Sequence, residues 1–323
     1  MNVVFIIEGG PECSLCSIPA LRKFIKNNPL DIVKICTKYD NLYWGLNEFD
    51  GKVLNIDHKG VFDNAFSFAD KVVTVNPYRV PRYYRQEKHL IEAIDVIVNE
   101  THNHTDLERA KLAISKEEEL RAVEVVKSLR FREGDANLRF TVVIEPWSFI
   151  SATRSGEYVI DSTSKSFETD FYVNLVRELS SKYNLILLSD TNLRLDADVY
   201  TEKINSSDLR TWASIIDSAD YFVGCDSVGQ HMAYGLNKPG AVILGSSFAS
   251  NVSYIRHFKI YENPGFKKYC PQTISEVEEK SANIANDNRM VFTEQQMSEI
   301  VRMIDDDIER SYKKDGNMPS SFY

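Results

Sequence analysis

Apolar runs alternate with amphipathic stretches along the first 130 residues of the chain. Runs rich in Val and Ile predict strands at 3–7, 32–36, 53–56 and 72–75, and helices are expected around 19–25, 88–98 and 115–129. The last of these opens with a capping box, Ser115 and Glu118, and keeps its apolar residues on one face. Strands that alternate with helices predict a parallel sheet covered by helices, which is an α/β fold.

A second cycle of the same pattern begins at residue 141. Strands are expected at 141–144 and 185–188, and helices at 169–183 and 208–218. A final helix begins at Thr293 and carries an apolar stripe of Met297, Ile300, Val301, Ile304 and Ile308. The pattern therefore predicts one domain over residues 1–138 and another over 139–292, followed by a helix and a loose tail over 293–323.

Residues 219–247 form the most informative unit of the second cycle. An apolar run ends at Gly224, Asp226 and Ser227 follow as helix starters, and a second apolar run reaches Gly245. In open α/β sheets, ligands bind beyond the carboxyl ends of the strands, where helix N-termini present N–H groups and partial positive charge. We therefore expect the amides of Ser227, Val228 and Gly229 to receive a phosphate.

Composition narrows the class of protein. A chain of 323 residues with 43% hydrophobic content suits two packed domains, and its apolar runs fall short of a bilayer span. The opening apolar run lacks the basic flank of a signal peptide, and five scattered cysteines favour a reducing cytoplasm. The net charge of −9 disfavours a protein that coats nucleic acid, although a local basic groove remains compatible with it.

Three motifs resemble those of the heptosyltransferases, glycosyltransferase family nine. The first motif contains Asp226-Ser227, then His231 five residues after the Asp, then Lys238-Pro239 and a strand that ends in Gly245-Ser246. The second motif is Pro19-Ala20-Leu21. The third is Lys165, which stands just before a predicted helix. This chain departs from the family pattern because Val228 stands where a Gly usually follows Asp-Ser. The resemblance implies a GT-B fold, with two Rossmann-like domains facing an interdomain cleft, and it allows the last helix to cross back to the first domain.

Sugar transfer from a nucleoside-diphosphate sugar, the co-substrate that this resemblance implies, requires a base and a group that balances the charge of the departing diphosphate. Lys165 and the amides at 227–229 fit the second role, with no metal and no permanently bound cofactor, and Asp226 and His231 are expected to bind the donor. The family places an Asp six residues before Pro19, where this chain has Cys13. Its neighbour Glu12 is therefore our candidate base, and a solvated loop carboxylate is the plain alternative.

A basic segment over 76–89 follows the fourth strand of the first domain. It contains Arg79, Arg82, Tyr83 and Arg85, and together with Gly9 and Gly10 it is our candidate acceptor-binding surface. Such a patch suits the phosphates of a lipopolysaccharide core, and it equally suits a DNA backbone with tyrosines stacking on bases. A solvated loop that happens to be basic is the neutral interpretation.

Three further motifs compete with this interpretation. Cys13 and Cys16 form a CxxC between a strand and a helix, Asp196 and Asp198 form a DxD, and residues 102–104 form an HxH. The CxxC would suit redox chemistry, and the DxD would suit metal binding. The HxH is interpreted as a pair of surface histidines. None has a second supporting feature in the chain.

The sequence thus predicts an inverting, metal-independent glycosyltransferase of the GT-B class with a saccharide acceptor. Two alternatives stay open: a phage-type DNA glycosyltransferase that acts on a hydroxymethylated base, and a sugar-nucleotide binding protein without turnover. The donor base, the sugar and the oligomeric state are not determined by the residues.

Overall fold

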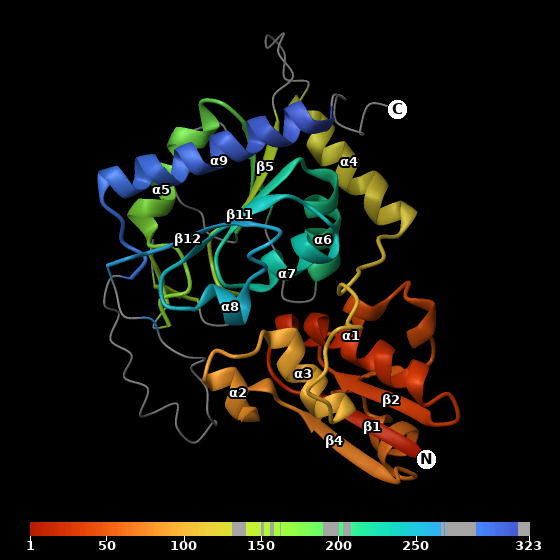
Figure 1. Ribbon diagram of the computed structural model, residues 1–323. Coiled ribbons are helices and arrows are strands. Elements are labelled where there is room, and N and C mark those ends of the chain that lie inside the picture. The colour runs from red at the N-terminus through yellow and green to blue at the C-terminus, as the bar shows by residue number, and fades with distance from the viewer. Residues whose placement is uncertain are drawn as a thin grey trace. The chain divides into compact units, whose positions relative to one another are not determined.

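The chain folds into two compact α/β units (Figure 1). The computed structural model describes residues 1–130, 140–149, 152–155, 158–161, 163–189, 200–202, 208–265, 268 and 289–315. The first unit contains Met1–Ala113 and Ser250–Val252, and the second contains Ile114–Ala249 and the described residues from Ser253 onward.

The first unit is built on a four-stranded parallel sheet. Its strands are β1 (Asn2–Ile7), β2 (Ile32–Thr37), β3 (Val53–Asn55) and β4 (Lys71–Val75), in the order β3-β2-β1-β4. The helices α1 (Pro11–Asn27) and α3 (Leu90–Asn99) pack against each other. A π-helical turn, η3 (Phe62–Phe66), packs Ala65 against Val4 and Cys36. Short turns η1 (Asp40–Tyr43), η2 (Asn47–Phe49), η4 (Pro77–Arg79) and α2 (Pro81–Tyr84) complete this unit.

The second unit is built on a six-stranded parallel sheet. The strands are β5 (Thr141–Glu145), β8 (Asn184–Leu188), β9 (Tyr200–Glu202), β10 (Tyr221–Gly224), β11 (Gly240–Leu244) and β12 (Lys259–Glu262), in the order β12-β11-β10-β5-β8-β9. Its helices are α4 (Lys116–Arg130), α5 (Thr169–Ser180), α6 (Leu209–Ser218), α7 (Val228–Gly235) and α9 (Glu294–Asp315). The short helix α8 (Ala249–Val252) follows β11 in the chain, and its residues 250–252 group with the first unit. The strands β6 (Thr153–Ser155) and β7 (Tyr158–Ile160) form an antiparallel hairpin. The sequence does not predict this hairpin, nor β9, α8 and β12, because these elements are too short to show periodicity.

The last helix, α9, packs within the second unit (Figure 1). It contacts α5, β11 and β12, and Ile300 and Ile304 have no exposed surface. The predicted apolar stripe is confirmed, since its members belong to one core cluster with residues of β5, β10 and β11.

Helix α4 also groups with the second unit, so the division falls between Ala113 and Ile114 instead of at residue 138. The reason is its packing on α6, where Arg210 makes a two-pronged ion pair with Glu118 at 2.8 and 2.7 Å. Burial would raise the pKa of Glu118, but Arg210 and Ser115 outweigh it and lower this pKa to about 2. Ser115 and Glu118 make the predicted capping box.

Parallel topology gathers the carboxyl ends of neighbouring strands at one edge of each sheet. In the second unit β5 ends in Glu145, β10 leads into Asp226, and β11 leads into Ser246-Ser247. In the first unit they lead into Glu8 after β1 and Asn76 after β4. Across the described ranges, no helix is long and apolar enough to cross a bilayer.

Candidate functional site

An ion pair lies at the carboxyl edge of the second sheet. Lys165 Nζ is 3.2 Å from Asp226 Oδ2, which also accepts a hydrogen bond of 2.5 Å from Ser247 Oγ. The Lys165 side chain is 24% exposed and that of Asp226 is 8% exposed. Two residues predicted from separate motifs are thus brought together, and the ammonium group remains within reach of solvent.

The loop that carries Lys165 is held by Asp161. Its carboxylate accepts hydrogen bonds from the amides and hydroxyls of Thr163 and Ser166. Burial would raise the pKa of Asp161, but these hydrogen bonds outweigh it and keep the pKa below its usual value. Ser246 Oγ donates to the Thr163 carbonyl at 2.8 Å, which ties this loop to the end of β11. Lys165 therefore projects from a fixed support.

His231 lies on α7 and is 1% exposed. Its Nδ1 is 2.8 Å from the hydroxyl of Tyr254. Burial lowers the pKa of His231 to about 4, because the raising effect of Asp226 is smaller than the cost of desolvation. The imidazole is therefore neutral at pH 7 and lies within electrostatic range of both Asp226 and Lys165.

This pKa predicts a pH-dependent stability. Because His231 has a pKa of about 4 in the folded chain and an ordinary value of 6.5, the unfolded chain binds more protons between these values. The free energy of unfolding should therefore fall as the pH drops from about 6.5 to 4, by about 3 kcal/mol from this group. Above pH 6.5 the imidazole is neutral in both states, so this loss is absent there. Urea unfolding of His231→Gln across this range should show a shallower slope than wild type, whereas the exposed His102→Gln should not.

The start of α7 is covered by groups of the chain itself. Val228 has no exposed surface and Ser227 is 5% exposed. Ser227 is the N-cap residue, but its hydroxyl accepts from the amide of Phe149 at 2.9 Å and makes no bond to its own helix. The buried carboxyl group of Glu145 lies against Gly229, in the first turn. The residues of the expected phosphate site at 227–229 are thus buried in the structure, and phosphate binding there stays a prediction.

Glu145 also explains where the glycine of the motif stands. A Cβ at residue 229 would overlap Oε2 of Glu145 and would lie 3.1 Å from the Phe222 ring. No such contact arises at Val228, which packs in the core. The glycine of this chain thus stands one residue later than in the family pattern, at the position where the carboxyl group of Glu145 leaves no space for a side chain.

We expect Gly229→Ala to destabilise the chain by about 1–3 kcal/mol through overpacking. The cost should fall by at least about 1 kcal/mol when Glu145 is also replaced by alanine, because the overlap is then removed. A double-mutant cycle in urea measures this coupling, with Gly265→Ala as the control, since a Cβ there meets its nearest neighbour at 3.6 Å. An equal cost of Gly229→Ala in both backgrounds would contradict the explanation.

Other parts of the 219–247 motif are structural. Lys238 Nζ donates to the carbonyls of Asp217 and Ala219 at the end of α6, at 2.8 and 2.5 Å. Cations suit helix C-termini, where carbonyls lack intrahelical partners. The Lys-Pro pair thus joins α6 to the turn before β11.

Glu12 occupies the first turn of α1, at the carboxyl edge of the first sheet. It is partly exposed, whereas Cys13, which stands at the family's Asp position, has no exposed surface. The chain enters α1 through Gly9, whose φ of +92° suits glycine, and through Gly10, the N-cap residue. Burial, and then Glu12, raise the pKa of Tyr39. Glu8 instead accepts a hydrogen bond of 2.8 Å from Asn76.

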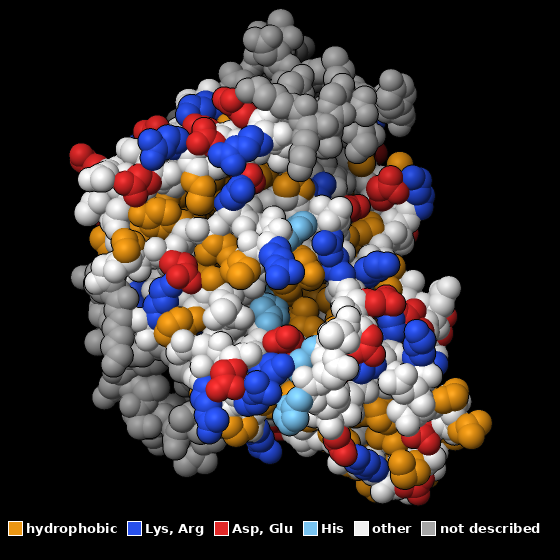
Figure 2. All heavy atoms as spheres, viewed as in Figure 1, with side chains coloured by type: hydrophobic (Ala, Val, Ile, Leu, Met, Phe, Trp, Pro, Cys, Tyr) orange, Lys and Arg blue, Asp and Glu red, His pale blue; other side chains and the backbone are white. Residues whose placement is uncertain are grey.

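The basic segment after β4 is only partly as predicted. Arg79 and Arg85 are exposed, and Arg82 pairs with Glu87 at 2.8 Å. Tyr83 is 2% exposed and packs edge-on against Tyr78, so its ring is not available for stacking on a base. Figure 2 shows acidic and basic side chains interspersed over the visible face. This arrangement weakens the DNA interpretation.

The structure describes two of the three competing motifs, the CxxC and the HxH. Cys13 and Cys16 are not joined in a disulfide and are fully buried, which is unlike a reactive thiol pair. Asp196 and Asp198 lie outside the described residues. Within the described part of the chain, no group of three or more His, Cys, Asp or Glu side chains is arranged to hold a metal ion.

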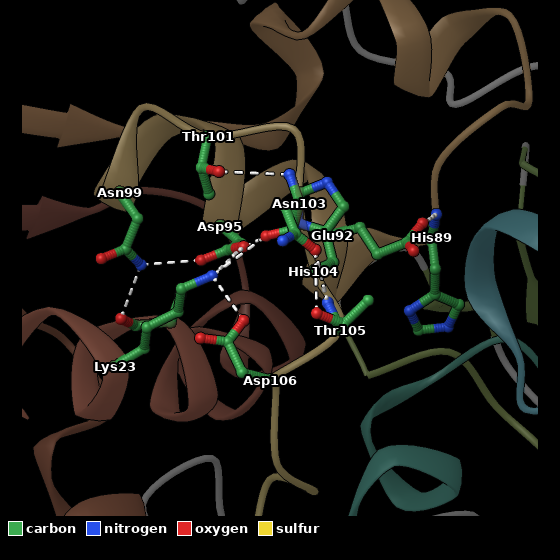
Figure 3. A network of polar contacts seen from close by, with 11 residues as sticks. Lys23, His89, Glu92, Asp95, Asn99, Thr101, Asn103, His104, Thr105 and Asp106 are labelled. Carbon is green, nitrogen blue, oxygen red and sulfur yellow. Dashed lines mark hydrogen bonds and ion pairs between the residues drawn. The ribbon is translucent and has the colours of Figure 1, made fainter.

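The HxH pair is divided between two environments. His102 is exposed, whereas His104 turns inward and its Nδ1 donates to Asp95 Oδ2 at 2.6 Å (Figure 3). Asp95 has no exposed surface, and Lys23 Nζ lies 3.3 Å from the same oxygen and 3.0 Å from Asp106. The network fastens the loop after α3 onto α1 and α3.

Replacing Asp95 by alanine should destabilise the chain by about 3–5 kcal/mol, because it leaves buried donors and a cation without their acceptor. Asp106→Ala is the matched control. That carboxylate is 61% exposed, and its loss should cost less than about 1 kcal/mol. Equal effects of the two substitutions in chemical denaturation would show that burial does not govern this network.

The two parallel-sheet units and their strand orders define the GT-B fold. No family model matches the chain, and neither does any curated protein. Solved structures do. A glycosyl transferase family 9 protein from Veillonella parvula superposes with a TM-score of 0.62 at 13% identity, covering 95% of this chain and 97% of its own.

Two Escherichia coli proteins share the fold as well. The iron-containing dodecameric glycosyltransferase TibC gives a TM-score of 0.61 at 11% identity, covering 97% of this chain and 79% of its own. The ADP-heptose lipopolysaccharide heptosyltransferase II gives 0.50 at 11% identity, covering 88% and 98%. The fold expected from the motifs is thus confirmed.

Sequence reasoning missed three residues of this site: Glu145, Ser247 and Tyr254. Glu145 directly follows an apolar run, and an acid at the end of a predicted parallel strand is a usable signal. Ser247 stands in the same relation to β11. Tyr254 carries no signal in the sequence, because its contact with His231 depends on the tertiary packing of the segment after α8.

Proposed function

We propose that this protein is a glycosyltransferase that moves a sugar from a nucleoside-diphosphate sugar to an acceptor hydroxyl. The observation that carries the proposal is the partly exposed Lys165, paired with Asp226 and braced by the Asp161 loop at the carboxyl edge of the second sheet. A cation held there suits the diphosphate of a donor. TibC, which shares the fold with a TM-score of 0.59, has been solved with ADP-D-β-D-heptose.

In the proposed reaction the acceptor oxygen attacks the anomeric carbon of the donor sugar, and the bond from that carbon to the diphosphate oxygen breaks. Glu12 takes the proton of the acceptor hydroxyl, and the configuration at the anomeric carbon inverts. Lys165 leaves Asp226 to meet the charge of the departing diphosphate, without a metal ion. Because Glu145 already lies against Gly229, we assign the larger share of this stabilisation to Lys165 and a smaller share to the amides at 227–229.

We propose a saccharide of the lipopolysaccharide type as acceptor, with Arg79 and Arg85 as the exposed cations that meet its phosphates. Support comes from the fold shared with the lipopolysaccharide heptosyltransferase II. We also assign Gly9 and Gly10 to the acceptor, because they lead from β1 into the first turn of α1, which carries Glu12.

A thermal-shift panel of nucleotide sugars tests the donor assignment. A true donor at 100 times its dissociation constant should stabilise the chain by about 2.7 kcal/mol. Release of nucleoside diphosphate on addition of a saccharide acceptor then excludes a binding protein without turnover. Absence of any shift across the panel would refute the proposal, and salt-sensitive binding of duplex DNA would favour the DNA-modifying alternative.

A further inference from the structure

The ring of Tyr254 is held against three aromatic neighbours in the second unit. It stacks on Tyr234 with centroids 3.6 Å apart and an interplanar angle of 7°, and it meets Phe258 edge-on at 6.0 Å. The His231 ring stands perpendicular to it, at 86° and 5.6 Å. These contacts leave the phenol little freedom to rotate, so its hydroxyl has a fixed position relative to His231.

That hydroxyl meets one particular nitrogen of the imidazole. The distance from the Tyr254 hydroxyl to His231 Nδ1 is 2.8 Å. A neutral imidazole has one N–H donor and one acceptor nitrogen, and the hydrogen bond made by one nitrogen decides which of them carries the proton. The acceptor nitrogen of imidazole is a stronger base than a phenol oxygen, so the phenol is the better donor of the pair.

We propose that Tyr254 is a positioning residue that holds His231 as the tautomer protonated on Nε2, and that His231 in this form donates a hydrogen bond to an oxygen of the donor. The second half of this inference rests on the proposed function. The burial of His231 keeps the ring neutral, so that both nitrogens retain their distinct roles at neutral pH. The neighbouring His257 provides an internal reference, because its Nε2 donates to the backbone carbonyl of Lys238 at 2.8 Å, which fixes the proton on that nitrogen.

The first test is ¹⁵N NMR of histidine-labelled full-length protein at pH 7. We expect wild-type His231 to show protonated Nε2 and unprotonated Nδ1. Tyr254→Phe keeps the stacked ring and removes only the hydroxyl, so the His231 signals should shift toward a mixture of tautomers while His257 stays unchanged. Tyr234→Phe, which removes the hydroxyl of the stacking partner, should leave His231 unchanged. A proton on Nδ1 in wild type, or identical His231 signals in Tyr254→Phe, would overturn the assignment.

The second test is kinetic. The KM for the nucleotide sugar should rise about 5- to 10-fold in Tyr254→Phe, as expected for one weakened hydrogen bond, with kcat changed much less. A changed tautomer with an unchanged KM would overturn the role in donor binding. Failure of wild type to bind any nucleotide sugar would instead refute the proposed function, and the NMR result would still decide the tautomer.

Discussion

Replacing Lys165 by methionine should lower kcat by about 100- to 1000-fold, the usual effect of removing one group that stabilises developing charge. Methionine keeps most of the length of the side chain and removes its charge. The ammonium group lies 3.2 Å from Asp226, and in the proposed reaction it meets the charge of the diphosphate as it leaves. Initial rates of nucleoside-diphosphate release, at saturating donor and acceptor, measure this effect.

Lys182→Met is the matched control for this experiment. Lys182 also makes an ion pair, at 2.6 Å from Asp305, but it is 47% exposed and joins the end of α5 to α9. Its loss should change turnover by less than about twofold, since exposed pairs contribute little. If Lys165→Met retained wild-type turnover while remaining folded, the charge-balancing role would be wrong.

Glu12→Gln should lower kcat by about 100- to 10,000-fold, because glutamine cannot accept the proton of the acceptor hydroxyl. The KM for the donor should stay near its wild-type value, since Glu12 is proposed to act only on the acceptor. Single-turnover rates with a saccharide acceptor give the most direct measurement.

Glu8→Gln distinguishes the two carboxylates of the first loop. The carboxylate of Glu8 accepts a hydrogen bond of 2.8 Å from the side-chain amide of Asn76, whereas Glu12 is partly exposed in the first turn of α1. A larger loss of kcat in Glu8→Gln than in Glu12→Gln would move the base to Glu8. Unchanged turnover in both variants would show that neither glutamate takes the proton.

The sequence predicts the frame of the molecule well because the frame depends on periodicity. The stripe from Met297 to Ile308 and the capping box at Ser115 are local signals, and both appear in the structure. The motifs assign both Lys165 and Asp226 to the donor, but the ion pair between them is a finding of the structure that the motifs do not predict.

What the sequence could not predict depends on contacts between distant segments. The burial of Tyr83 is decided by tertiary packing, although the residue lies in a run of charged neighbours. The covering of the α7 start by Glu145 joins residues of β5 and α7 that are far apart in the chain. Neither segment alone could predict that the carboxyl group of Glu145 lies beside Gly229.

Calorimetric titration of nucleoside diphosphates into wild type and Lys165→Met tests the central claim most directly. ADP, UDP, GDP and CDP serve as probes, since the sequence does not determine the nucleobase of the donor. Wild type should bind one of them saturably, and Lys165→Met should bind it about 10- to 100-fold more weakly, as expected for the loss of a charge-assisted contact. Equal affinity in the two proteins, or no binding of any of the four to wild type, would contradict a diphosphate site at Lys165.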